Sequence, residues 1–187
     1  MRFGFSARLF AIAFVVSAFA VGIAGGLAEA NASEASFYRD VQGKWSGPGE
    51  IVAGKYKGTK FTCNFNGLEP SARNGMNIDG TCRVGVFNQP MNASFIRTAS
   101  GYSGRFLDGE AGEGMDVIGG RFSGSKVVVD VKRKDLRGVM VANLTSNDKL
   151  NITISVRVQN RLIPVIGMTL DRVGTTDGVV TSSVNKK

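Results

Sequence analysis

The chain has 187 residues, a formal net charge of +8, two Cys and no His, and this length suits a single domain. The absence of His excludes Ser-His-Asp and Cys-His catalysis as well as His-ligated zinc. Two cysteines are too few for an all-thiolate tetrahedral metal site. Hydrophobic residues make up 43% of the chain, which predicts a folded core and excludes a wholly disordered protein.

The N-terminus has the features of a secretory signal peptide. Arg2 and Arg8 provide a basic start, and an apolar run then leads to A-x-A cleavage sites ending at Ala30 and Ala32. A membrane anchor is the alternative, although the run of about 16 residues is shorter than the roughly 20 that span a bilayer. We expect residues 1–32 to be removed, giving a periplasmic or secreted protein without a transmembrane segment in its mature chain.

Cys63 and Cys82 are the only cysteines, and both lie in β-like segments. An oxidising compartment would join them in a disulfide. If their segments form a hairpin with the cysteines opposite each other, offsets of two place further pairs on the same face. These pairs are Phe65 with Gly80 and Phe61 with Val84.

Alternation of apolar and polar residues dominates the rest of the chain. In residues 149–159, five apolar side chains from Leu150 to Val158 alternate with polar ones, which predicts a half-buried antiparallel strand. A short helical turn is expected at 33–41. Other β-rich segments cover 44–53, 57–66, 77–87, 91–99, 102–107, 115–122, 126–132, 139–145 and 161–173.

Short Gly-rich turns between these segments predict an all-β fold. We expect one antiparallel up-and-down β-barrel of about eight to ten strands, closed so that no strand edge is exposed. The domain would cover residues 33–173 and be followed by a polar tail over 174–187. Glycines inside the predicted strands suit the bulges and corners of a barrel; they are Gly85, Gly104, Gly119 and Gly120.

The first predicted strand begins with Gly43-Lys44-Trp45. This resembles the G-x-W entry of the lipocalins and the wider calycin group of barrels, whereas the second lipocalin signature, a Thr-Asp-Tyr element, has no match. The resemblance implies that Trp45 closes one end of the barrel and that an Arg from the last strand packs across it. Arg172 is the best candidate and Arg161 the second, and such a contact would be a cation–π interaction.

The order of Trp45, Cys63 and Cys82 is also similar in outline to that of small periplasmic inhibitors of secreted metalloproteases. Those proteins form eight-stranded barrels with one disulfide and an early Trp. This second resemblance implies a protein that binds a protein partner.

A basic cluster occurs at one predicted turn. Outside the cytosol its anionic partners would be lipid headgroups, lipopolysaccharide or wall polymers rather than nucleic acid. If this turn shares a barrel end with Lys55, Lys57 and Lys60, the two would form a headgroup-binding rim; the alternative is a solvated hairpin tip. The cluster consists of Lys126, Lys132, Arg133, Lys134 and Arg137.

The richest acidic stretch runs from Asp108 to Asp116 on a Gly-rich backbone. Four carboxylates on a flexible loop are suited to Ca²⁺, and the alternative is an exposed acidic loop. No spacing in the sequence fixes a carboxylate pair for glycoside hydrolysis. We therefore expect no metal, no cofactor and no enzymatic activity.

The leading hypothesis is an exported, monomeric, non-enzymatic protein that binds a small apolar or lipid-like ligand or an envelope component. The alternative is a periplasmic protein-partner binder, such as a protease inhibitor or an envelope assembly factor. The barrel interior discriminates between them, because ligand pockets usually measure roughly 300–1,000 Å³ and a cavity below about 150 Å³ would favour partner binding.

Overall fold

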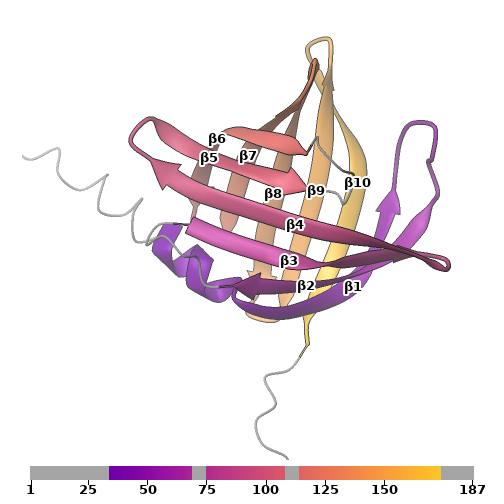
Figure 1. The fold of residues 1–187 in the computed structure, drawn as a ribbon, viewed down its shortest axis with the longest axis horizontal. Helices are drawn as coiled ribbons and strands as arrows, with labels where there is room; N and C mark the ends of the chain where they lie inside the picture. Colours follow the sequence, from indigo (N-terminus) through magenta and orange to yellow (C-terminus); the bar gives the residue numbers. More distant parts are fainter. Residues whose placement is uncertain (1–33, 69–74, 108–113, 174–187) are drawn as a thin grey trace, which may run out of the picture.

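The computed structural model describes residues 34–68, 75–107 and 114–173. Ten antiparallel strands form a closed barrel in which each strand pairs with its neighbours in sequence and β1 pairs with β10 (Figure 1). The expected all-β up-and-down barrel is confirmed. The strands are β1 Gly43–Ile51, β2 Lys60–Leu68, β3 Gly75–Val84, β4 Phe87–Thr98, β5 Gly101–Leu107, β6 Met115–Ser123, β7 Lys126–Arg133, β8 Leu136–Ser146, β9 Lys149–Val158 and β10 Arg161–Arg172.

The two ends of the barrel differ. A helix over residues 34–40 lies at the end where β1 begins and β10 finishes (Figure 1). Phe37, Tyr38 and Val41 from this segment are buried, so we call this end the floor. Because successive strands reverse direction, the β1–β2, β3–β4, β5–β6, β7–β8 and β9–β10 connections lie at the opposite end, which we call the rim.

The alternating apolar side chains predicted for the strands point into the barrel. On β7, Val127, Val129 and Val131 are buried, whereas Lys126 and Lys132 are exposed. Alternate side chains of a strand point to opposite faces of the sheet, so a period of two places one apolar set inside the barrel. On β9, Leu150, Ile152 and Ile154 line the interior as predicted, whereas Val158 at the end of the strand is 53% exposed.

Several inward glycines mark places where neighbouring backbones leave no room for a side chain. A Cβ on Gly47 would lie 2.1 Å from the carbonyl oxygen of Thr169, and one on Gly104 would lie 2.1 Å from that of Ser94. Glycine is the residue that permits such close backbone approach in a strand. Gly119 adjoins a register shift between β6 and β7, which is the expected bulge.

One predicted strand is interrupted in the structure. The segment expected over 77–87 ends at Val84, and Gly85, with a φ of 57°, and Val86 form a two-residue turn into β4. A glycine with positive φ at a hairpin turn explains the difference.

The disulfide between Cys63 and Cys82 is confirmed. The two residues are directly opposed on β2 and β3 with a Cα–Cα distance of 4.0 Å, and Phe65 faces Gly80 as expected. The ladder reaches only to the Thr62–Arg83 pair, so Phe61 has no partner at Val84. The Phe61 ring lies instead against Gly49, where an added Cβ would be 2.3 Å from it.

Candidate functional site: the barrel floor, interior and rim

Trp45 and Arg172 meet at the floor. Trp45 is 2% exposed, and its indole nitrogen donates a hydrogen bond to the Val41 carbonyl at 2.9 Å. The guanidinium carbon of Arg172 lies 4.2 Å from the centre of the Trp45 ring, within the cation–π range of about 6 Å. Arg161, the second candidate for this contact, begins β10 at the rim, so it belongs to the other end of the barrel.

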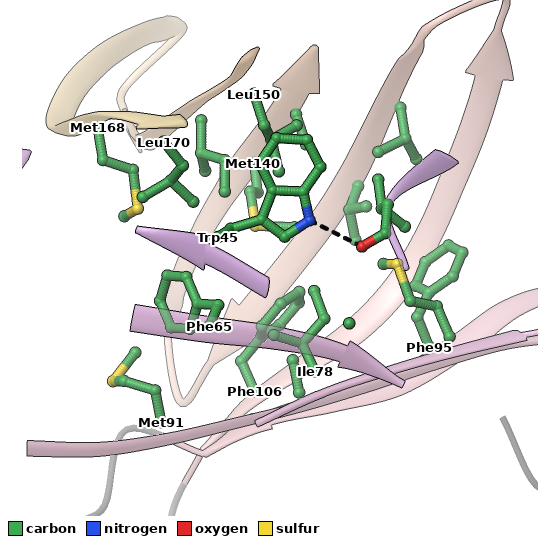
Figure 2. Close-up of a pocket in the computed structure, with 18 of the residues that line it drawn as sticks. Trp45, Phe65, Ile78, Met91, Phe95, Phe106, Met140, Leu150, Met168 and Leu170 are labelled. Carbon is green, nitrogen blue, oxygen red and sulfur yellow. Dashed lines mark hydrogen bonds between the residues drawn. The ribbon is translucent and has the colours of Figure 1, made fainter. Parts of the chain in front are cut away.

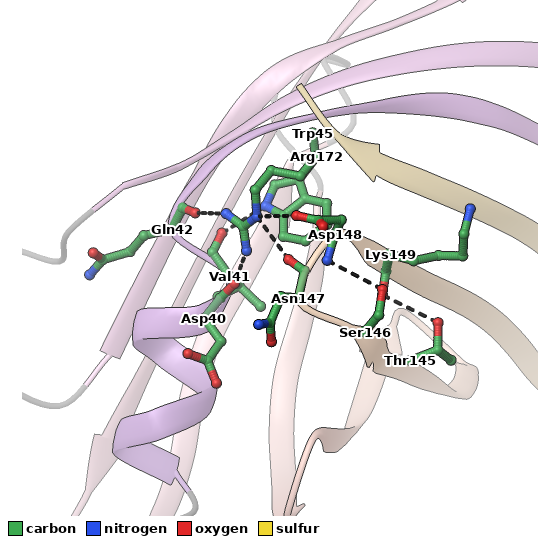
Figure 3. Close-up of polar contacts among 10 residues, drawn as sticks. All are labelled: Asp40, Val41, Gln42, Trp45, Thr145, Ser146, Asn147, Asp148, Lys149 and Arg172. Atoms are coloured by element: carbon green, nitrogen blue, oxygen red, sulfur yellow. Dashed lines mark hydrogen bonds and ion pairs between the residues drawn. The ribbon is translucent and has the colours of Figure 1, made fainter. Parts of the chain in front are cut away.

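The Arg172 guanidinium also binds three backbone carbonyls (Figure 3). It donates hydrogen bonds to the oxygens of Asp40 and Gln42, both at 2.6 Å, and to that of Asn147 at 2.8 Å. The Asp148 carboxylate lies 3.8 Å from its Nε atom. One side chain therefore joins the end of the helix, the entry to β1 and the β8–β9 turn.

The glycine of the G-x-W entry has a structural role beside this contact. Gly43 has a φ of +99°, and a Cβ at this position would lie 3.2 Å from the Arg172 guanidinium. Residues with a side chain rarely adopt that backbone conformation. The chain can therefore turn from the helix into β1 while leaving space for the guanidinium.

A buried carboxylate that sequence reasoning missed anchors the helix. Glu34 is 4% exposed and accepts hydrogen bonds from Tyr38 at 3.0 Å, Arg97 at 2.7 Å and Tyr102 at 2.7 Å. Both carboxylate oxygens are used. The only sequence signal was the i, i+4 spacing of Glu34 and Tyr38 in the predicted short turn.

The two tyrosines in this cluster are held in their neutral form. Burial, followed by the hydrogen bond to Glu34 and its negative charge, raises the pKa of Tyr102 to about 12. Burial and Glu34 raise the pKa of Tyr38 well above its ordinary value. Because Glu34 is occupied by three donors, the cluster is suited to holding the helix on the floor.

The barrel interior contains an apolar cavity of about 110 Å³ (Figure 2). Apart from Asn92 and the indole nitrogen of Trp45, its lining side chains are apolar, and that nitrogen is already bonded to Val41. The walls come from both halves of the barrel, with Phe65 and Ile78 facing Met140 and Leu150 (Figure 2). Such a space offers dispersion contacts and burial but no chemistry.

The volume is below the limit of about 150 Å³ set from the usual size of ligand pockets. A compact drug-sized ligand therefore does not fit this conformation. The lining includes four methionines, whose unbranched side chains adapt their shape to a neighbour more readily than other core residues do. They are Met76, Met91, Met140 and Met168.

The predicted basic cluster lies at the rim. The β7–β8 turn, which follows Arg133, is at the same barrel end as the β1–β2 loop with Lys55 and Lys57. The basic turn and the lysine-rich β1–β2 loop therefore lie at one barrel end, which is the arrangement that a headgroup-binding rim requires. Of the basic cluster, Lys132, Lys134 and Arg137 are exposed and Arg133 is half-buried. Lys126 does not join them, because it begins β7 at the floor, a full strand length from the turn.

Other sequence expectations fall partly outside the described residues. These include the signal peptide, the C-terminal tail and most of the acidic stretch, of which Asp116 is described. Within residues 34–68, 75–107 and 114–173, no group of three or more His, Cys, Asp or Glu is placed to hold a metal ion. The same residues contain no helix with the length and apolarity needed to cross a membrane.

Comparisons with known proteins give similarity of fold only. No family model and no curated protein matches the chain. A redesigned β-barrel is similar at 9% identity and a TM-score of 0.42, covering 73% of this chain and 95% of its own. A protein of unknown function of the DUF3598 family from Nostoc punctiforme is similar at 11% identity and a TM-score of 0.47; the match covers 72% of this chain but 48% of that protein.

Proposed function

We propose that this protein is an exported, calycin-like binding protein whose interior takes a narrow hydrocarbon group, such as one chain of a lipid-like molecule. The observation that carries the proposal is the almost wholly apolar lining of the interior cavity, whose volume of about 110 Å³ leaves room for a narrow chain but not for a drug-sized ligand. The G-x-W entry, with Arg172 across Trp45, supports the calycin-like part. The disulfide supports export, because such bonds persist in oxidising compartments.

The cavity has an energetic cost that a ligand would relieve. Protein interiors normally pack as densely as organic crystals, and an empty apolar volume of 110 Å³ costs about 2.5 kcal/mol of stability. A hydrocarbon group that fills this space recovers the missing contacts. The free energy of unfolding would therefore rise on binding, with the logarithm of the ratio of ligand concentration to dissociation constant.

The size of the cavity restricts the ligand. An engineered apolar cavity of about 150 Å³ binds benzene, so the volume described here accommodates a few carbon atoms without rearrangement. A longer chain would need movement of the methionines that line the cavity, such as Met140 and Met168. The proposal is therefore a chain-shaped ligand and excludes a bulky fused-ring one.

The test begins with protein purified after export by the cells that express it. Native mass spectrometry should reveal a retained lipid-sized mass, and straight-chain carboxylic acids of increasing length should raise the melting temperature of ligand-free protein. In Ala142→Leu the new side chain would enter the cavity, because Ala142 lines it. This variant should lose both the bound mass and the temperature shift.

Thr153→Leu is the matched control. Thr153 is exposed on the outer face of β9, so this variant adds a similar apolar side chain outside the barrel and should bind as the wild type does. Absence of a retained mass together with absence of a temperature shift in the wild-type protein would overturn the proposal.

Protein-partner binding is the second candidate function, and the volume of the cavity, which is too small for a drug-sized ligand, favours it. In that case the interior is a packed core and the surface makes the contacts. Recovery of one stoichiometric protein partner with the ligand-free wild type, undiminished by Ala142→Leu, would support this function over ligand binding.

A further inference from the structure

Exposed apolar side chains gather at the rim. Eight of the twelve large apolar side chains that are exposed among the described residues lie on the rim connections or next to them. The most exposed are Val86 at 86% and Phe87 at 76%, both at the β3–β4 turn. The remaining six are Val52, Tyr56, Val84, Leu136, Val158 and Leu162.

These exposed apolar side chains lie at four of the rim connections, β1–β2, β3–β4, β7–β8 and β9–β10. Basic side chains occupy the same four connections. Within the described residues, ten Lys and Arg lie on these connections or the adjoining strand ends, whereas the carboxylates there belong to Glu50 and Asp135. The ten are Lys55, Lys57, Lys60, Arg83, Lys132, Arg133, Lys134, Arg137, Arg157 and Arg161. We call these ten residues and the eight apolar ones the rim arc.

The rim arc is continuous around the barrel. In the closed order β3–β2–β1–β10–β9–β8–β7, the β3–β4, β1–β2, β9–β10 and β7–β8 connections follow one another. They lie along the upper and right side of Figure 1, away from the helix. Of the acidic stretch, the described residue Asp116 lies on β6, where it is paired with Lys132 of the arc.

The floor has a different character. Two of its ion pairs join Arg97 to Glu34 at 2.7 Å and Lys149 to Asp171, whereas Lys44 and Lys126 are exposed there. The ten basic side chains and the eight exposed apolar ones of the arc therefore lie together at the rim. A charged partner alone would not require the apolar tips, and an uncharged apolar partner would not require the basic residues.

We propose that the rim arc docks the protein onto an anionic phospholipid bilayer. Basic side chains would contact lipid phosphates, and apolar tips such as Phe87 and Leu136 would enter the boundary between headgroups and acyl chains. Surface attraction to anionic lipid grows with the number of Lys and Arg near the membrane, and apolar burial adds to it. This docking does not depend on the occupant of the cavity.

The test measures binding of the exported protein to vesicles. Vesicles of equal parts phosphatidylglycerol and phosphatidylcholine should bind it, and binding should weaken as salt screens the charges. Pure phosphatidylcholine vesicles should bind it at least about tenfold more weakly. Equal binding to the two vesicle types would overturn the proposal.

Two variants separate the charged from the apolar part. Lys57→Glu with Arg137→Glu should weaken vesicle binding by at least about tenfold. Val86→Ser with Phe87→Ser should weaken it by about tenfold while leaving its salt dependence unchanged. If this second variant binds like the wild type, or if soluble polyphosphate saturates the protein as effectively as the vesicles do, docking onto a bilayer is overturned.

Matched controls lie at the floor and the barrel wall near it. Lys44→Glu with Lys126→Glu makes the same charge change, and Leu68→Ser with Ile96→Ser makes a similar apolar change, all at exposed positions. These controls should bind vesicles like the wild type. Ala142→Leu should also keep vesicle binding, so failure of rim docking and failure of the cavity function give different results.

Discussion

Arg172 is paired with Trp45 across the junction of β10 and β1. Side chains of directly opposed residues lie on the same face of a sheet, which is why the guanidinium lies over the indole at 4.2 Å. The contact therefore sits at the position where the last strand meets the first. Its three backbone hydrogen bonds extend that junction to the helix and the β8–β9 turn.

Trp45→Ala should lower the free energy of unfolding by about 3–5 kcal/mol, the usual effect of removing a large buried aromatic side chain. Trp45 is 2% exposed and lines the cavity, so the substitution enlarges an existing void. Urea unfolding monitored by circular dichroism measures the change. A loss below about 1 kcal/mol would contradict a core role for Trp45.

Arg172→Ala should be less costly than Trp45→Ala, at about 2 kcal/mol. Two of the three carbonyls that it leaves are exposed and the third is part-buried, so they can bond to water. Arg172→Lys keeps the charge but cannot reproduce three directed hydrogen bonds from a planar fork. The lysine variant should therefore recover less than half of the loss. Full recovery by lysine would show that charge alone matters at this position.

Replacing Cys63 and Cys82 by alanine should cost about 3 kcal/mol. The bond closes a loop with a sequence separation of 19, and a loop of this size restricts the unfolded chain by roughly that amount. Thermal unfolding of the double variant without reductant gives the comparison. The wild type, heated with reductant, should approach the same melting temperature.

Stability should fall as the pH rises from about 10 towards 12. The pKa of Tyr102 is raised from 10.0 to about 12 in the fold, and that of Tyr38 is raised further in the same direction. In this range the folded protein retains phenol protons that the unfolded chain has lost, so rising pH favours unfolding. Urea midpoints at successive pH values test this, and Tyr102→Phe should reduce the slope.

Gly47→Ala and Gly167→Ala should have opposite outcomes. A Cβ on Gly47 would lie 2.1 Å from the Thr169 carbonyl oxygen, whereas one on Gly167 would meet nothing within 4 Å. The first variant must separate β1 from β10 and should lose several kcal/mol, within the upper range for point changes. The second should be neutral or gain about 0.5 kcal/mol. Melting temperatures of the two variants decide the matter.

The sequence predicted the barrel because strand alternation is a local signal. The alternation that begins at Leu150 can be recognised without knowing which strand pairs with it. The pairing of Cys63 with Cys82 was predicted from the geometry of a hairpin. The Glu34 cluster could not be predicted in the same way. Its donors Arg97 and Tyr102 lie 63 and 68 residues away, so it exists only after the barrel has closed.

The cavity volume was also beyond sequence reasoning. It depends on how side chains such as Met140 and Phe65 fill the interior, and composition does not fix their rotamers. The rim was only partly predictable. Its basic cluster was visible as a run from Lys132 to Arg137, but Phe87 was predicted as the last residue of a strand over 77–87, whereas it begins β4 after an exposed turn.

The pairing of β1 with β10 has a kinetic consequence. The paired residues Trp45 and Arg172 come from the two ends of the domain, so the final ladder cannot form until almost the whole chain is available. Such distant contacts slow folding, because the entropy of a long loop is lost before the contact stabilises anything. We expect refolding on the scale of milliseconds to seconds, and a nascent chain ending before β10 should remain open and accessible to proteases.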